Sequence, residues 1–203
     1  YGGTTSALGF KSEGTNFTGS LLIGHSTTGV ISSAEENTGV GIGALDALTT
    51  GGSNVAVGYN AGTSINSGAS NVVVGFAAGD ALSSGSQNVA IGRNSLTTED
   101  TGSRNTAIGR GTLQNLNFNG NGYNVAVGYN AGLNVTTGTQ NTLIGSAAGD
   151  AVTTGEFNVA MGYNALSSAT DTDQSVAIGH NAGRQVTTGT QNTIIGGQAG
   201  DSL

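Results

Sequence analysis

The sequence predicts an all-β protein, a parallel β-roll or β-solenoid of about eleven short coils. Two observations on the repeats predict this class. The phrase Asn-Val-Ala-Val-Gly at 54–58 returns with small changes along almost the whole chain. Its closing glycine recurs every 17 residues, as from Gly58 to Gly75, with one step of 19 between Gly109 and Gly128. A unit this short cannot enclose a core of its own, so neighbouring units must cover one another.

Each unit is expected to begin with a short strand. Runs such as Val-Ala-Val and Val-Ala-Ile lie between an asparagine and a glycine, and β-branched runs bounded by turn formers are typical of strands. The chain contains 37 glycines, and a glycine inside a helix costs about 1 kcal/mol relative to alanine, so helices are not expected. The predicted strands directly follow Asn54, Asn71, Asn88, Asn105, Asn124, Asn141, Asn158, Ser175 and Asn192.

A second block follows each marker glycine. Examples are Tyr59-Asn-Ala-Gly62 and Tyr129-Asn-Ala-Gly132, and most units then reach another glycine, such as Gly68 or Gly138. Glycine and small polar residues at these positions predict a weaker strand or a turn. Each unit is therefore expected to be a two-sided coil with two glycine-marked corners.

The glycines and asparagines of the repeat are interpreted as structural. Glycine at a corner permits a positive φ angle or a close approach of two chain segments. The asparagine four positions earlier is expected to stack on its copies in adjacent coils or to hold a turn. These structural repeat residues are Gly58, Gly75, Gly92, Gly109, Gly128, Gly145, Gly162, Gly179 and Gly196, preceded by Gly24 and Gly43, together with Asn54, Asn71, Asn88, Asn124, Asn141 and Asn158.

Both faces of the predicted strands are uncharged, which predicts an oligomer. On one face, β-branched residues such as Val55 and Val57 are expected to fill the interior of the coil. The opposite face is small or aliphatic, whereas a strand wetted on that side would carry Thr, Lys or Glu. We therefore expect a homotrimer whose sister chains meet at this second face. The trimer-facing residues of this prediction are Ala56, Ala90, Ala107, Ala126, Ala160 and Ala177.

Composition limits the classes of function. Charged residues make up 8% of the 203 residues, and the formal net charge is -7. The few scattered cations cannot form the basic stripe that neutralises a phosphate backbone, so nucleic acid is not an expected partner. The absence of cysteine excludes disulfides and thiolate metal sites. No apolar stretch approaches the roughly 18 residues of a membrane-spanning helix, so no membrane insertion of this segment is expected.

The chain is expected to contain two regions. The repeat array is assigned to 39–203 and is expected to continue beyond the last residue, because the sequence breaks off inside a repeat. The less regular segment 1–38 is interpreted as a cap or junction, since the terminal units of an array must cover an exposed end.

Two protein families have similar repeats. The strand phrases Asn88-Val-Ala-Ile-Gly92 and Ser175-Val-Ala-Ile-Gly179 resemble the head repeats of YadA-like trimeric autotransporter adhesins. The longer phrase Asn-Val-Ala-Val-Gly-Tyr-Asn-Ala-Gly, at 54–62 and 124–132, is similar to the Gly-Tyr-Asn-Ala repeats of bacteriophage and other viral fibre proteins. The resemblance covers roughly Ser20 to the end of the chain.

Each resemblance implies a fold and a role. The adhesin resemblance implies a left-handed parallel β-roll in a tightly wound homotrimer that holds bacteria to host matrix or to each other. The phage resemblance implies a trimeric tail-fibre segment that contacts the host surface. The unit of 17 residues is longer than that of the adhesin heads, as the step from Gly58 to Gly75 shows, so wider turns are expected here.

Motifs for chemistry are missing from the sequence. There is no Gly-x-Ser-x-Gly elbow with a usable base, no phosphate-binding loop and no evident acid/base pair of carboxylates. We therefore expect no enzymatic activity, no cofactor and no metal. His25 and His180 follow marker glycines, and a histidine site on a trimer axis is the alternative to a simple variant of that position. Asp80 and Asp150 are interpreted as turn caps or exposed charges, with calcium binding as the alternative.

Two features offer aromatic rings for recognition. The 19-residue unit adds Phe118 and Tyr123 among asparagines, a composition suited to polar or glycan contacts, so both are possible ligand contacts. The alternative is a loop that only fills space. Rings also recur directly after the marker glycine, at Tyr59 and Tyr163 for example, where carbohydrate stacking is the alternative to packing.

Together these patterns predict a structural, surface-exposed trimeric fibre segment that mediates attachment to a cell surface. Its expected location is extracellular, on a virion fibre or a bacterial cell surface, and its expected partners are its own copies and a cell-surface glycan or protein receptor. One alternative is the head of a bacterial trimeric autotransporter adhesin that binds host matrix or other cells. A second is an ice- or mineral-binding solenoid, because Thr-Thr-Gly recurs, although Ser, Asp and Asn interrupt the threonine positions.

Overall fold

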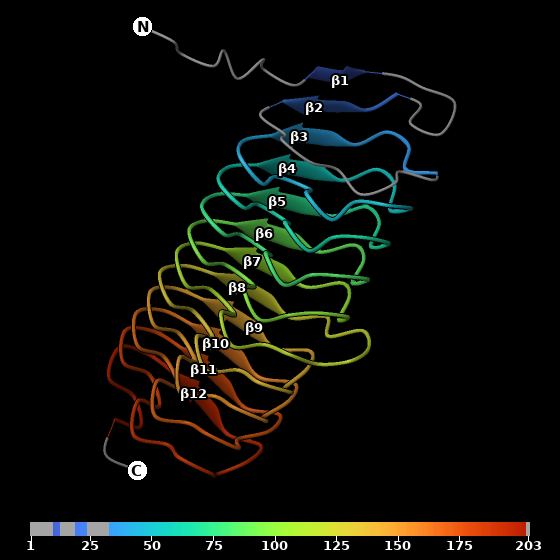
Figure 1. Cartoon of the computed structure of the whole chain (residues 1–203). Coiled ribbons are helices and arrows are strands. Elements are labelled where there is room, and N and C mark those ends of the chain that lie inside the picture. The colour runs from blue at the N-terminus through green and yellow to red at the C-terminus, as the bar shows by residue number, and fades with distance from the viewer. Residues whose placement is uncertain (1–9, 13–18, 24–32, 202–203) are drawn as a thin grey trace, which may run out of the picture.

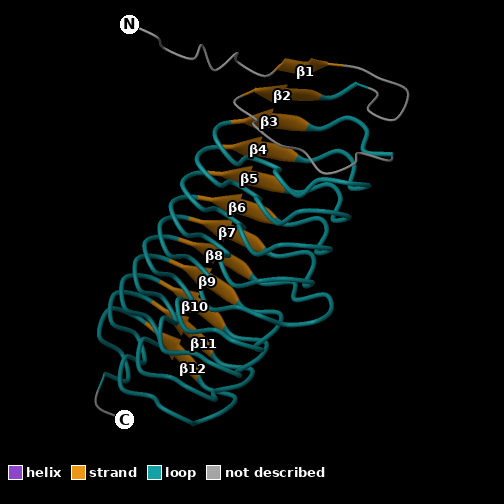
Figure 2. Ribbon diagram, viewed as in Figure 1, coloured by secondary structure: helices purple, strands orange, loops and turns teal. Residues whose placement is uncertain are grey.

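The computed structural model describes residues 10–12, 19–23 and 33–201. Within these ranges the chain winds as a solenoid, and each coil adds one strand to a single twelve-stranded sheet (Figure 1). The strands stack in sequence order; β1 and β2 are antiparallel, and every later pair is parallel. Figure 2 shows that turns and loops make up the remainder of each coil. The predicted all-β parallel solenoid is confirmed, and the described ranges contain no helix.

Every strand is three residues long, which leaves most of each coil to turns. The strands are β1 (Phe10–Ser12), β2 (Leu21–Ile23), β3 (Thr38–Val40), β4 (Val55–Val57), β5 (Val72–Val74), β6 (Val89–Ile91), β7 (Thr106–Ile108), β8 (Val125–Val127), β9 (Thr142–Ile144), β10 (Val159–Met161), β11 (Val176–Ile178) and β12 (Thr193–Ile195).

The register of the sheet follows the sequence repeat. Val55 pairs with Val72, and the 19-residue coil keeps the same alignment because Thr106 pairs with Val125. The two extra residues are therefore accommodated outside the sheet. Leu21 already pairs with Thr38, one 17-residue step further on.

The register also corrects the start of the glycine series. The residue one step before Gly58 is Gly41, and a Cβ there would lie 2.4 Å from the Gly58 carbonyl oxygen, as at the later corners. Gly43, which the sequence suggested, lies in the following turn. Gly24 and His25, with most of the predicted cap 1–38, lie outside the described residues.

The central residue of each strand points into the coil. The residues Ala56, Ala90, Ala107, Ala126, Ala160 and Ala177 are all 0% exposed within the single chain. Val55 and Val57 flank Ala56 and are 36% and 38% exposed. The predicted facing is therefore wrong, because these alanines belong to the core of their own chain and the β-branched residues form the outer face. The coil is too thin for the reverse arrangement, since buried residues of its other side, such as Ile65, occupy the interior opposite the strand.

Large core residues enter a strand only where the opposite turn leaves room. Leu143 replaces alanine in β9, and the same coil carries Gly149, where a Cβ would lie 2.7 Å from Leu143 Cδ2. In the next coil, that turn position holds the buried Leu166 and the strand holds Ala160. The core volume of a coil is thus shared between its two sides, as close packing requires.

The asparagines form a buried hydrogen-bonded ladder. The Asn71 N–H donates to Asn54 Oδ1 at 3.0 Å, and the Asn71 side-chain amide donates to the Gly85 carbonyl oxygen at 2.8 Å. Each amide bonds to its copy in the adjacent coil, so the predicted stacking is confirmed. The turn that the Asn71 amide holds is that of the next coil, at Gly85, and not the turn formed by its own neighbours. The ladder also includes Asn105, which accepts from the Asn124 N–H at 3.2 Å.

The marker glycines serve both predicted purposes at once. Gly58 has a φ of 135°, a conformation that L-residues with a side chain rarely adopt, and a Cβ on it would lie 2.4 Å from the Gly75 carbonyl oxygen. The corner therefore needs glycine for its backbone angle and for the close approach of the next coil.

The second block of each unit forms turns and not a strand. Asn60 and Gly62 have φ angles of 52° and 56°, so the chain turns twice within three residues. Backbone hydrogen bonds still join the coils on this side, as from the Gly62 N–H to the Ala78 carbonyl oxygen at 2.9 Å. Both sides of the solenoid are thus tied from coil to coil.

Candidate functional site: the outer face of the sheet and its corners

The outer face of the sheet carries an uncharged aliphatic stripe. In every strand from β4 to β12, the first and third residues point outward and are half-buried or exposed. These positions hold valine or isoleucine, apart from three threonines and one methionine, Thr106, Thr142, Thr193 and Met161. We call this surface the aliphatic stripe. It runs the length of the array without a charge.

One border of the stripe is a ladder of rings and guanidinium groups, which we call the ring ladder. Tyr59 stacks on Phe76 with 5.3 Å between ring centroids, and Tyr163 stacks on His180 at 5.6 Å. The guanidinium carbon of Arg93 lies 5.4 Å from the centroid of the Phe76 ring. The full ladder is Tyr59, Phe76, Arg93, Arg110, Tyr129, Ser146, Tyr163 and His180. The rings pack on one another and remain open to solvent.

The other border is a ladder of residues that directly precede the buried asparagines. Each has a positive φ, such as 63° at Arg104 and 51° at Tyr123. Arg104 donates from Nε to Gln87 Oε1 at 2.8 Å, and its guanidinium carbon lies 5.5 Å from the centroid of the Tyr123 ring. Sequence reasoning missed this ladder. The available signal was the variable, mostly polar residue that always stands before the repeated asparagine.

The structure separates the two residues that the sequence grouped as possible ligand contacts. Tyr123 lies on the border ladder and is 49% exposed. Phe118 is partly buried and packs against the hydrophobic core, and its backbone N–H donates to Glu99 Oε2 at 3.3 Å. Only Tyr123 of this pair therefore has an exposed ring that a ligand could reach.

A buried carboxylate supports the 19-residue coil. Glu99 is 0% exposed and occupies a core position that is Leu82 one coil earlier and Leu116 one coil later. Its Oε1 accepts from the Gly102 N–H at 2.8 Å. Burial raises the pKa of Glu99, because removal from water penalises the charged form, and the backbone N–H groups of Gly102 and Phe118 oppose this shift.

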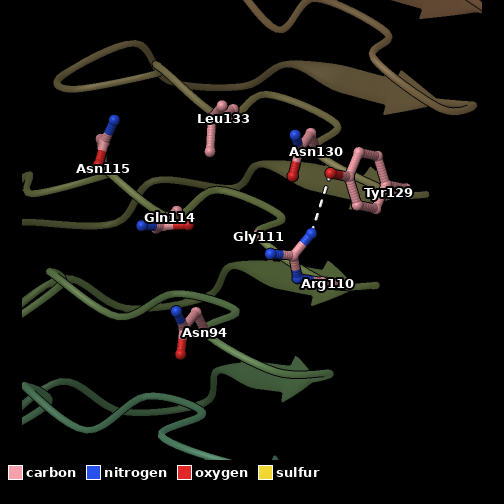
Figure 3. Close-up of a pocket in the computed structure, with 8 residues that line it drawn as sticks. All are labelled: Asn94, Arg110, Gly111, Gln114, Asn115, Tyr129, Asn130 and Leu133. Atoms are coloured by element: carbon pink, nitrogen blue, oxygen red, sulfur yellow. Dashed lines mark hydrogen bonds between the residues drawn. The ribbon is translucent and has the colours of Figure 1, made fainter.

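A hollow opens at the corner between β7 and β8, next to the ring ladder. It has a volume of about 280 Å³ and is lined by Asn94, Arg110, Gly111, Gln114, Asn115, Tyr129, Asn130 and Leu133. Figure 3 shows Arg110 and Tyr129 on neighbouring coils, with the Arg110 Nη1 donating to the Tyr129 hydroxyl at 2.9 Å. The lining is rich in amides and contains no carboxylate.

Two further carboxylates with a shifted pKa, Asp80 and Asp150, lie in turns. Burial raises the pKa of Asp80 and Asp150, and backbone N–H groups of their own turns oppose the shift, which fits a role as turn caps. Asp201 forms an ion pair with Arg184 at 2.8 Å. No group of three or more His, Cys, Asp or Glu side chains among the described residues could hold a metal ion.

No protein-family model, curated protein or solved structure matches this chain. In the part of the chain that the structure describes, no helix has the length and apolar character needed to cross a membrane.

Proposed function

We propose that this chain is a segment of a left-handed homotrimeric fibre, extracellular and surface-exposed, that attaches a virion to a cell surface. The observation that carries the proposal is the aliphatic stripe. Soluble monomers rarely expose contiguous apolar patches larger than a few hundred Å². A stripe of this length without a charge therefore favours burial against other chains.

The size of the surface fits such an assembly. Nine strands, β4 to β12, at about 4.8 Å each give a length of about 40 Å, and the stripe with its two border ladders is about 20 Å wide. The resulting area of about 800 Å² is what one partner contributes to a stable interface of standard size. In this arrangement the outer valines and isoleucines face the sister chains, in place of the alanines expected from the sequence.

The repeat phrase supports the viral role. The Gly-Tyr-Asn-Ala resemblance at 58–61 and 128–131 favours a tail-fibre segment, and the ring ladder and hollow offer groups for contact with a cell-surface glycan or protein receptor. The head of a bacterial trimeric adhesin is the second candidate, because the shorter strand phrases resemble it and the same stripe would serve its assembly. The outward strand positions are mainly aliphatic, so the sheet does not offer the threonine array of an ice-binding surface.

Light scattering on the purified chain tests the assembly. A trimer has a mass of 3 × 19.8 = 59.4 kDa. Val127→Glu places a charge on the stripe and should lower the mass toward 19.8 kDa while strand circular dichroism is retained. Ala126→Glu buries a charge in the core and should abolish the folded signal. The exposed Thr137→Glu should change neither property.

A wild-type mass of 19.8 kDa at micromolar concentration would contradict the trimer. Attachment is tested separately by sedimenting labelled protein with intact bacterial and animal cells. If no cell type retains more label than an unrelated soluble protein of similar charge, the attachment role is wrong even if the trimer forms.

A further inference from the structure

Three of the four arginines of this acidic protein lie beside two neighbouring strands of the sheet. Arg93, Arg104 and Arg110 are exposed; Arg93 borders β6, and Arg104 and Arg110 border the two ends of β7. Residues 101–149 contain no aspartate or glutamate, and of the two carboxylates between Arg93 and Arg104, Glu99 is buried and Asp100 accepts from the Ser83 hydroxyl. Within the described ranges the ion pair between Arg184 and Asp201 involves none of them. The middle of a chain with a net charge of -7 therefore carries three exposed arginines that form no ion pair among the described residues.

Two of these arginines are neighbours in the ring ladder, and their side chains diverge. Arg93 lies over Phe76 in the preceding coil, whereas Arg110 lies over Tyr129 in the following coil, at 5.4 Å to each ring centroid. Two like charges on adjacent coils repel each other, and an anion bound beside them would relieve that repulsion. The aromatic rings hold both guanidinium groups in place without neutralising them.

The hollow beside Arg110 exists because one turn position lacks a side chain. Gly111 stands in the ladder position that Asn94 holds one coil earlier and Asn130 one coil later. A Cβ on Gly111 would lie 2.5 Å from Asn130 Oδ1, so a side chain there would enter the space and displace that amide. The missing side chain leaves a concave surface next to Arg110, whose guanidinium group donates to the Tyr129 hydroxyl and has no ion-pair partner among the described residues.

The lining has the chemistry of a saccharide site. Amide side chains such as Gln114 and Asn130 can both donate to and accept from vicinal hydroxyl groups. The exposed ring of Tyr129 offers an apolar face for a sugar ring. A guanidinium group recognises a carboxylate or sulfate through paired hydrogen bonds. Two adjacent cations are too few to follow a nucleic-acid backbone, so a sugar that carries an acidic group is the better fit.

We propose that this corner, with Arg110 and Arg93 as its cationic groups and the Gly111 hollow as its sugar-binding surface, binds an acidic saccharide. The inference rests on the proposed attachment role, for which it names the class of receptor. The shared recognition element is an anionic group, carboxylate or sulfate, on a chain of otherwise neutral sugar rings.

Isothermal titration of the purified chain tests the site with three probes: an oligogalacturonate, a sulfated dextran oligosaccharide and the unmodified dextran oligosaccharide. At least one acidic probe should bind, and the neutral probe should bind at least tenfold more weakly. Tighter binding of the oligogalacturonate would show that the site prefers a carboxylate, and tighter binding of the sulfated dextran oligosaccharide would show that it prefers a sulfate. Arg110→Ser, which introduces the residue found at Ser146, should weaken binding about tenfold, since a charge-assisted hydrogen bond is lost. Gly111→Asn should weaken it at least as much by filling the hollow.

Matched controls separate the site from general charge effects. Arg184→Ser removes the same charge on a distant coil, and Ala147→Asn places the same amide at the same ladder position two coils away, where φ is 54°. Both controls should bind within twofold of the wild type. Equal losses in Arg110→Ser and Arg184→Ser, equal binding of neutral and acidic probes, or no binding of either acidic probe would overturn the proposal.

The mass and cell-sedimentation measurements make failure of the saccharide site distinguishable from failure of the proposed function. A trimer that sediments with cells but binds no acidic saccharide refutes only the site. A chain that binds the acidic probe through Arg110 but does not sediment with cells refutes the attachment role and leaves the saccharide site standing.

Discussion

The regular coils and the coil that precedes the 19-residue unit satisfy their backbone hydrogen bonds in different ways. Regular coils use the last glycine of the unit, which lies between the marker glycine and the repeated asparagine of the next coil. The Gly68 N–H donates to the Ser83 carbonyl oxygen of the next coil at 3.1 Å, and the Gly138 N–H donates to that of Thr153 at 3.3 Å. In the coil that precedes the insertion, the equivalent Gly102 N–H donates instead to the side chain of Glu99 at 2.8 Å. A repeat array therefore tolerates an irregular unit when a side chain replaces the missing backbone partner.

This replacement explains a residue that breaks the core pattern. Glu99 stands among buried aliphatic residues, and an unpartnered carboxylate there would be strongly unfavourable. It is stable because the insertion leaves the N–H groups of Gly102 and Phe118 for it to accept. The insertion and the glutamate are thus one structural feature, although they lie in different units of the sequence.

The largest contrast between the two regions should appear at their glycines. Gly145→Ala, in a regular corner, forces a side chain at a φ of 131° and to within 2.5 Å of the Gly162 carbonyl oxygen. We expect it to lower the free energy of unfolding by about 3 kcal/mol or more, through backbone strain and displacement of the next coil. Gly120→Ala in the insertion shares the backbone strain, since φ is 150° there, but its Cβ meets only the Phe118 ring, at 3.0 Å, and no backbone of a neighbouring coil. We therefore expect a smaller loss of about 1–2 kcal/mol.

Urea unfolding followed by circular dichroism measures both glycine variants. Equal losses of stability would mean that the insertion is packed as tightly as the regular corners, which would contradict the contrast drawn between them.

The coupling between Glu99 and the insertion can be measured with a double-mutant cycle. Glu99→Leu restores the aliphatic core but leaves two backbone N–H groups without an acceptor, so we expect a loss of about 2 kcal/mol. Deleting Asn119 and Gly122 gives a 17-residue unit with glycine at the regular position. In that shortened chain Glu99→Leu should instead stabilise the fold by about 2 kcal/mol, because the carboxylate has lost its donors.

The same urea titrations give the four stabilities of the cycle. Additive effects of the substitution and the deletion would show that Glu99 does not act through the insertion. Leu82→Val, in the same core ladder of a regular coil, serves as the control and should cost about 1 kcal/mol in both backgrounds.

A smaller effect is expected from pH. The raised pKa of Glu99 means that the folded state holds this proton more tightly than the unfolded state does. Its contribution to stability is therefore complete below the ordinary glutamate pKa and is lost as pH rises through the higher folded value. Wild-type stability should fall more steeply than that of Glu99→Gln across this window. Parallel pH profiles for the two proteins would show that Glu99 titrates normally.

The sequence predicted the elements of this fold more reliably than their orientation. The period of the glycines located every strand from β4 to β12, because each strand must meet its copy one unit later. Alternation along a three-residue strand defines two faces, but both faces here are aliphatic. Hydrophobicity alone therefore could not show whether Ala56 or its two valine neighbours point into the coil. The wrong choice placed the proposed contact surface on the wrong residues.

The candidate site was only partly accessible to sequence reasoning. The ring ladder was visible as a repeated aromatic slot, and Tyr123 was singled out by its composition. The hollow at Gly111 was not, because it depends on a missing side chain between two amides that are 36 residues apart (94 to 130) in the chain. Glu99 was not recognised as a buried group either, since one polar residue in a repeat resembles a surface substitution until its neighbours are known.

The amino-acid sequence on its own determined the repeat, the one-coil register and the need for glycine and asparagine at fixed places, because these follow from interactions between identical neighbours. The three-dimensional packing decided which strand face is internal, where a carboxylate can be buried and where the surface is concave. These properties depend on the thickness of the coil and on contacts between its two sides, and residues on opposite sides of a coil share no pattern that a linear repeat reveals.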